Sequence, residues 1–154
     1  MRRRPLLLLV ATAAAIAAPP LPYDESADAR AAIRSARAAV GAGPRRVLIV
    51  FGANWCEDCR ALDQALKSAR NARLMAREFE VVKVDVGRFD RNLDIAQAYG
   101  DPIRKGIPAA VLLSPDERVL YATKAGELSN ARRMSATGIY DFFEGVARGA
   151  GSVR

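Results

Sequence analysis

The most constraining feature of the chain is Val47–Phe51, a continuous apolar run rich in β-branched residues. Because the run has no polar side to turn toward water, it is typical of a strand buried on both faces in a sheet that helices cover. Apolar residues also alternate along a second stretch, and a Pro-containing turn separates two more short runs. The further strands are expected at Phe79–Val86, Ala109–Leu113 and Val119–Tyr121.

Helical patterns alternate with these strands. An Ala-rich helix should begin after a cap at Asp24 or Ser26 and end near Val40, before a Gly-rich stretch. The other helices are expected at Cys56–Leu66, Ala72–Glu78, Asn92–Tyr99 and Ile139–Arg148. A strand-helix-strand order calls for a parallel pair with a right-handed crossover, whereas the later strand pair adds an antiparallel edge. The sequence therefore predicts an α/β fold, a three-layer α/β/α sandwich with a mixed central sheet.

The N-terminus has the composition of a secretory signal peptide. Arg2–Arg4 precede the apolar run Leu6–Ala18, and Ala15–Ala17 fits the small-x-small cleavage pattern. The run is shorter than the roughly 20 residues that a transmembrane helix needs, which favours a removed signal over a retained anchor. We divide the chain into a signal peptide (1–17), an N-terminal segment with the Ala-rich helix (18–44), a main domain (45–148) and a tail (149–154). Export would place the protein in the periplasm of a Gram-negative cell.

The residue counts exclude several kinds of chemistry. The chain of 154 residues has no histidine and two cysteines, so histidine-based triads and histidine-based metal sites are excluded. The formal net charge is +7, but Arg2–Arg4 would leave with the signal peptide. The remaining arginines are scattered and lack interleaved aromatic residues, so we expect no nucleic-acid partner.

The two cysteines lie directly after the buried strand, as Cys56-x-x-Cys59 at the start of a helix. Two intervening residues in a first helical turn bring the sulfurs within disulfide range. The first sulfur then lies at the helix N-terminus, where free N–H groups and the helix dipole stabilise a thiolate, the species that attacks disulfides. A structural disulfide and a thiolate metal site stay open as alternatives. We favour redox chemistry because a disulfide that closes so short a loop adds little stability, and because no other Cys or His completes a zinc site.

Several motifs together resemble the thioredoxin family over roughly residues 45–148. The Trp55–Cys59 motif, preceded by Phe51 and Ala53, is similar to the active-site strand and loop of that family. Gly106–Pro108 resembles its cis-proline loop, directly before a strand. Two shorter matches are Lys83–Val86, which is similar to the central strand, and Ala125-Gly126, which is similar to the late glycine turn. The resemblance implies the thioredoxin fold.

The resemblance also implies a role for each matched residue. Cys56 would be the exposed nucleophile, and Cys59 the buried resolving thiol. Trp55 would shield the site and offer a flat contact surface. Pro108 would be cis beside the two sulfurs, since proline tolerates a cis bond and has no N–H to compete for a sulfur. Ile107 would present its backbone groups to an extended substrate.

The sequence departs from the family pattern in two places. Val50 stands where the family often has a buried Asp that helps to deprotonate the resolving thiol, so we expect Lys83, its usual partner, to be a solvated lysine. Glu57 and Asp58 separate the cysteines, and two negative charges beside Cys56 should disfavour its thiolate. A weaker thiolate predicts a couple of reducing character rather than a strong oxidant.

These features together predict an exported thiol–disulfide oxidoreductase that exchanges a Cys56–Cys59 dithiol with cysteines of protein substrates. It would need no cofactor beyond this redox-active disulfide, and no metal. Its expected partners are exported proteins with cysteines and a membrane electron donor, and we expect a monomer. The alternatives from other classes are a non-catalytic thiolate copper carrier and a redox-inactive thioredoxin-like binding module.

Overall fold

The computed structural model describes residues 17–149. Apart from Ala17, the predicted signal peptide lies outside the described residues, as does the tail beyond Gly149. Within the described part, no helix has both the length and the apolar character needed to cross a membrane.

A four-stranded sheet forms the middle layer, in the order β2-β1-β3-β4. Strand β1 pairs in parallel with β2 and antiparallel with β3, and β3 pairs antiparallel with β4. The strands are β1 (Arg46–Gly52), β2 (Phe79–Asp85), β3 (Ala109–Leu113) and β4 (Val119–Ala122). The predicted mixed sheet is confirmed.

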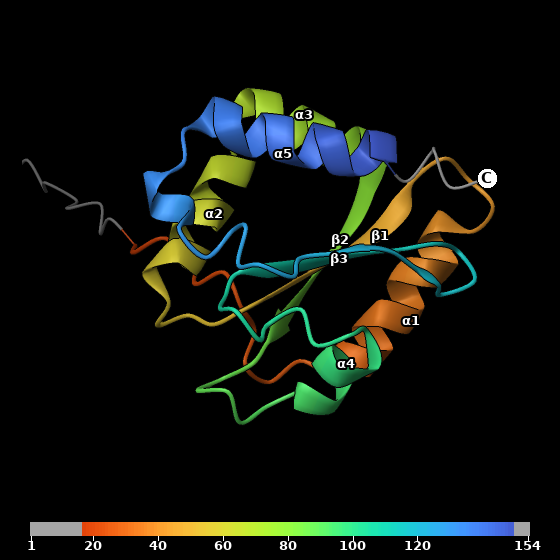
Figure 1. Cartoon of the computed structure of the whole chain (residues 1–154), viewed down its shortest axis with the longest axis horizontal. Coiled ribbons are helices and arrows are strands. Elements are labelled where there is room, and N and C mark those ends of the chain that lie inside the picture. Colours follow the sequence, from red (N-terminus) through yellow and green to blue (C-terminus); the bar gives the residue numbers. More distant parts are fainter. Residues whose placement is uncertain (1–16, 150–154) are drawn as a thin grey trace, which may run out of the picture.

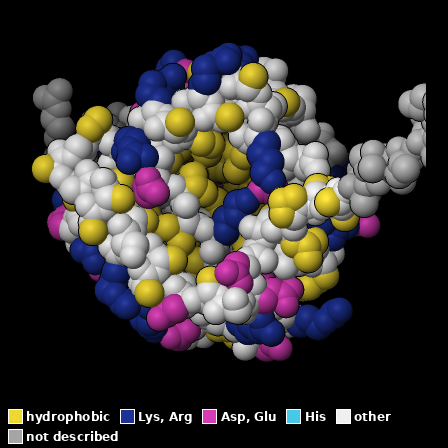
Figure 2. Space-filling view, turned by 180° about the vertical axis from the view of Figure 1, so that it is seen from behind, with side chains coloured by type: hydrophobic (Ala, Val, Ile, Leu, Met, Phe, Trp, Pro, Cys, Tyr) yellow, Lys and Arg dark blue, Asp and Glu magenta, His cyan; other side chains and the backbone are white. Residues whose placement is uncertain are grey.

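Helices cover both faces of this sheet (Figure 1). On one face lie α1 (Ala29–Val40) and α4 (Leu93–Ala98). On the other face lie α2 (Glu57–Leu66), α3 (Ala69–Glu78) and α5 (Ala136–Gly149), with the short 3-10 helix η1 (Ala131–Arg133) beside α2. The three-layer sandwich is therefore confirmed. On the reverse side, apolar side chains gather in a central hollow bordered by charged groups of both signs (Figure 2).

Strand β1 is buried on both faces because its side chains alternate between two cores. Val47, Ile49 and Phe51 pack in the core under α1, whereas Leu48 and Val50 pack in the core under α3 and α5. This alternation fixes the register, since a one-residue slip would exchange the two sets of side chains. The strand ends at Gly52, from which the cysteine loop leaves the sheet.

Several helices begin at residues other than those expected from the sequence. Helix α1 begins at Ala29 rather than after Asp24 or Ser26, because the Asp28 carboxylate accepts a hydrogen bond from the backbone N–H of Ala31. Asp24 instead accepts hydrogen bonds from both the N–H and the hydroxyl of Ser26 in a turn. Helices α3 and α5 each begin three residues earlier than expected.

Removing a large side chain from the second core should destabilise the fold. Phe143 is fully buried and makes edge-to-face contacts with Phe79 and Phe142. Phe143→Ala should lower the free energy of unfolding by about 3–5 kcal/mol, measured by urea unfolding. Val119→Ala is the control, since Val119 is an exposed β4 residue. Equal effects of the two changes would contradict the assignment of the core.

Candidate functional site

Strand β1 delivers Cys56 to the N-terminus of α2. Cys56 is the N-cap residue of this helix, and its Sγ accepts a hydrogen bond from the backbone N–H of Cys59 at 3.2 Å. A sulfur thus occupies the position where a helix N-terminus stabilises negative charge. The strand, the turn and the helix together place the two predicted cysteines in contact, as free thiols.

Cys56 is less accessible than expected for an exposed nucleophile. Cys56 is 6% exposed and Cys59 is 1% exposed. The prediction of an exposed Cys56 is therefore wrong for this conformation. Its Sγ is turned inward, toward the N–H of Cys59 on one side and the carbonyl of Ile107, at 3.7 Å, on the other. Cys56 is still the more accessible member of the pair.

The Ile107–Pro108 segment lies against the dithiol. Its peptide bond is cis, both residues are buried, and the Cys56 thiol is in contact with the Ile107 carbonyl oxygen. Residues 51 positions apart in the chain therefore meet at one point. The structure thus brings together the two motifs on which the predicted site rests.

Neighbouring groups lower the pKa of Cys56 to about 7. The largest cause is the hydrogen bond from the Cys59 thiol, and the backbone N–H of Cys59 adds to it. Burial and the charge of Asp58 act in the opposite direction. The prediction that the acidic pair leaves Cys56 with a disfavoured thiolate is thus wrong in its net result, although Asp58 does act with the expected sign.

The same contact raises the pKa of Cys59. Its thiol gives its hydrogen bond to Cys56, which favours the protonated form, and burial raises the pKa further. The pKa values of two chemically identical groups are therefore moved apart by their surroundings. One thiol can be a thiolate near neutral pH while the other keeps its proton.

Arg132 of η1 pairs with both acidic residues between the cysteines. Its guanidinium forms an ion pair with Glu57, and its backbone N–H donates to the Asp58 carboxylate at 2.9 Å. Arg60, whose charge follows the motif in the sequence, instead donates to the carbonyl of Asn54 at 2.7 Å. Sequence reasoning missed Arg132 because its loop carries no recognisable motif.

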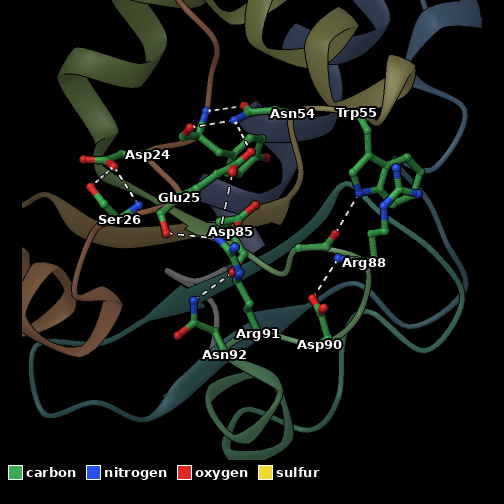
Figure 3. Close-up of polar contacts among 12 residues, drawn as sticks. Asp24, Glu25, Ser26, Asn54, Trp55, Asp85, Arg88, Asp90, Arg91 and Asn92 are labelled. Atoms are coloured by element: carbon green, nitrogen blue, oxygen red, sulfur yellow. Dashed lines mark hydrogen bonds and ion pairs between the residues drawn. The ribbon is translucent and has the colours of Figure 1, made fainter.

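Trp55 precedes Cys56 in the chain and lies on the surface, and Figure 3 shows its indole next to Arg88. It is 46% exposed, and its Nε1 donates to the carbonyl of Gly87 at 2.8 Å. Phe89, which is also exposed, packs edge-to-face against Trp55 with 6.3 Å between ring centroids. The indole is therefore held in place, and the exposed aromatic surface consists of two residues.

Lys83 is partnered rather than simply solvated, which corrects the expectation for it. Its ammonium group forms an ion pair with Asp63 of α2, a buried residue that also pairs with Lys67 at 2.7 Å. Burial raises the pKa of Asp63, but the hydrogen bonds and charges of the two lysines outweigh it and hold the pKa below its ordinary value. Val50 is buried and apolar, so the carboxylate nearest Lys83 comes from the helix and not from the strand.

Potential metal ligands do not gather in the described residues. Among residues 17–149, no group of three or more His, Cys, Asp or Glu side chains is arranged to hold a metal ion. The chemistry that the arrangement supports by itself is that of a thiolate with a second thiol in reach.

Comparisons with known proteins agree with this geometry. A family model described as thioredoxin-like matches residues 28–115. A crystal structure described as a disulphide isomerase from Xylella fastidiosa is 57% identical, covers 84% of this chain and 98% of its own, and superposes with a TM-score of 0.81. Among curated proteins, no sequence matches the chain.

Two more distant structures share the fold. A thioredoxin from Thermus thermophilus is 19% identical over 75% of this chain and 81% of its own, with a TM-score of 0.53. The oxidised DsbD C-terminal domain of Neisseria meningitidis is 19% identical over 77% and 96%, with a TM-score of 0.50. At this identity the similarity extends to the fold alone.

Removing the Cys59 thiol should raise the pKa of Cys56. In Cys59→Ala the main stabilising hydrogen bond is lost, so the pKa should rise from about 7 toward the ordinary value of about 8.5. Cys59→Ser is the matched control, because its hydroxyl still donates and should produce a smaller rise. The pH dependence of Cys56 alkylation measures both, and an unchanged midpoint in Cys59→Ala would contradict the assignment.

Neutralising Asp58 should have the opposite effect. Asp58→Asn removes a charge that raises the pKa of Cys56, so the midpoint of alkylation should move to lower pH. Glu57→Gln is the control, because the more exposed Glu57 carboxylate is paired with Arg132 and should matter less. A midpoint that stays in place or rises in Asp58→Asn would show that this charge does not act on Cys56.

Proposed function

This chain belongs to the thioredoxin-like family, and we propose that it is an exported thiol–disulfide oxidoreductase acting on cysteines of exported proteins. The observation that carries the proposal is the division of the two thiols. The pKa of Cys56 is lowered to about 7, whereas that of Cys59 is raised. A reactive thiolate beside a retained thiol is what a two-step exchange requires. The signal-like composition of residues 1–17 supports export.

The exchange would proceed in two displacements. The Cys56 thiolate attacks one sulfur of a substrate disulfide, and the other substrate sulfur leaves with the electron pair as a thiolate. Cys59 then loses its proton and attacks Cys56 Sγ. The Cys56–Cys59 bond forms, the bond to the substrate breaks, and the substrate departs as a dithiol after taking up two protons from solvent. The protein is oxidised by two electrons, and the substrate is reduced by two.

The surroundings of Cys56 suit an extended polypeptide substrate. The buried Ile107 would offer backbone groups to a substrate strand, as in β-strand addition. The exposed rings of Trp55 and Phe89 would contact side chains next to the substrate cysteine. We assign Glu57 and Asp58 to shaping the site, because Arg132 holds both.

We propose that the Cys56–Cys59 couple is reducing in character. The reason is not the charge of Glu57 and Asp58 but the pKa of Cys56. Known family thiolates range from a pKa of about 3.5 in a strong oxidant to about 7 in thioredoxin. Cys56 lies at the upper end of that range. In an oxidising compartment a reductase needs a membrane electron donor, which we include as a proposed partner. Isomerisation is the second candidate, favoured by the name of the relative that is 57% identical.

Trapping tests the proposal directly. Cys59→Ser should accumulate mixed disulfides on Cys56 in the periplasmic fraction, and mass spectrometry should identify their partners. Cys56→Ser is the control and should trap nothing. Insulin reduction should require both cysteines, whereas rearrangement of a scrambled disulfide protein should persist without Cys59 if the protein is an isomerase.

The reduction potential tests the direction. Equilibration with glutathione should give a value nearer that of thioredoxin, about −270 mV, than that of the strongest oxidant, about −120 mV. A value near −120 mV would overturn the reducing assignment. A Cu(I) complex without measurable disulfide exchange would instead identify the copper carrier.

A further inference from the structure

A tyrosine from outside the matched family region lies beside the resolving thiol. Tyr23 is 4% exposed and belongs to the same buried cluster as Cys56 and Cys59. It precedes α1 and lies before residue 28, where the family match begins. If the signal peptide ends at residue 17, the processed protein keeps Tyr23. A phenol buried at a redox pair calls for an explanation beyond packing, because burying a hydroxyl group is costly unless it finds a partner.

Gly52, the last residue of β1, provides the space for this phenol. A Cβ placed on Gly52 would lie 2.2 Å from the Tyr23 hydroxyl oxygen and 2.9 Å from Cys59 Sγ. The hydroxyl and the sulfur therefore both lie within 2.9 Å of the same point. Any larger residue at position 52 would collide with both groups. The absence of a side chain there leaves room for the phenol next to the sulfur.

The cysteine loop itself fixes the position of Tyr23. Asn54 accepts a hydrogen bond from the Tyr23 N–H at 2.9 Å and donates to the Tyr23 carbonyl at 2.9 Å. Its amide also donates to the Glu25 carboxylate at 3.0 Å. Arg91 then donates to the Glu25 carbonyl at 3.1 Å and pairs with Asp85 (Figure 3). The backbone of Tyr23 is thereby anchored to Asn54, which lies two residues before Cys56.

The surroundings keep the phenol protonated. Burial raises the pKa of Tyr23 well above its ordinary value, and the charges of Cys59, Cys56, Asp63 and Asp85 raise it further. At neutral pH the group is therefore a hydrogen-bond donor and not a base. It therefore cannot remove the proton from Cys59, but its O–H can donate a hydrogen bond to a negatively charged sulfur.

We propose that Tyr23 is a positioning residue for the resolving step, whose hydroxyl donates a hydrogen bond to Cys59 Sγ when that thiol loses its proton. This inference rests on the proposed exchange function. In the step, the Cys59 proton passes to solvent, the Cys59–Cys56 bond forms, and the bond from Cys56 to the substrate sulfur breaks. The electron pair leaves with the substrate thiolate, and the phenol proton stays on Tyr23.

Such a hydrogen bond should give a net gain in rate. Burial disfavours the Cys59 thiolate, so the fraction present as thiolate limits its attack. Lowering a thiol pKa by one unit increases that fraction about tenfold, whereas nucleophilicity falls by only about threefold. The N-terminal segment thus contributes to the dithiol site.

The reaction of the reduced protein with dithiobis(nitrobenzoate) separates the two steps. The first aromatic thiolate is released when Cys56 attacks, and the second is released when Cys59 displaces it from Cys56. Tyr23→Phe keeps the ring and removes only the hydroxyl. It should slow the second release about three- to tenfold and leave the first within about twofold. Tyr121→Phe, on β4, is the control and should change neither phase.

The outcomes distinguish this inference from the proposed function. A second release in Tyr23→Phe that matches the unaltered protein, or two phases slowed alike, would overturn the role of Tyr23. Urea unfolding of Tyr23→Phe shows whether an equal slowing of both phases reflects lost stability. If the unaltered protein shows no second release at all, the proposed exchange function fails first.

Discussion

The hydrogen bond from the Cys59 thiol to the Cys56 sulfur is the interaction on which the site depends. It lowers the pKa of one cysteine and raises that of the other, so a single contact creates both a nucleophile and a reserve thiol. The contact exists because Cys56 is the N-cap of α2 and Cys59 lies in the first turn. That arrangement depends on β1, whose alternating packing between two cores fixes its register and which ends at Gly52, just before the cysteine loop.

The charges around the dithiol show why counting residues in a motif can mislead. Two carboxylates between the cysteines should oppose a thiolate, and Asp58 does so. However, the hydrogen bonds to Cys56 act at contact distance, whereas the carboxylates are shared with Arg132, 74 positions from Asp58 in the chain. A directed hydrogen bond to the charged sulfur of Cys56 outweighs the charge of a partly solvated carboxylate that Arg132 already pairs with.

Local patterns were sufficient to predict the sheet and the cysteine motif, and the resemblance to the thioredoxin family supplied the role of the Ile107–Pro108 segment. Val47–Phe51 had to be buried on both faces, and the C-x-x-C spacing had to lie on a first helical turn. The remaining features depend on contacts between distant residues. The Asp63–Lys83 pair joins α2 to β2, and Arg132 reaches the motif from η1, so neither has a signal in its own segment. Helix α1 began late because Asp28 competed successfully with Asp24 and Ser26 for the capping role.

Gly52, Asn54 and Tyr23 depend on one another physically. Asn54 is useful as a backbone clamp only if a segment lies against it, and that segment can bring a phenol to Cys59 only if residue 52 has no side chain. From the sequence each residue is unremarkable by itself, as a glycine at a strand end, a polar turn residue and a lone aromatic after prolines. Together they place Tyr23, which lies outside the family match, against the dithiol site. The stability of the N-terminal segment and the chemistry of Cys59 are therefore coupled, since whatever displaces the segment also removes the hydroxyl from the sulfur.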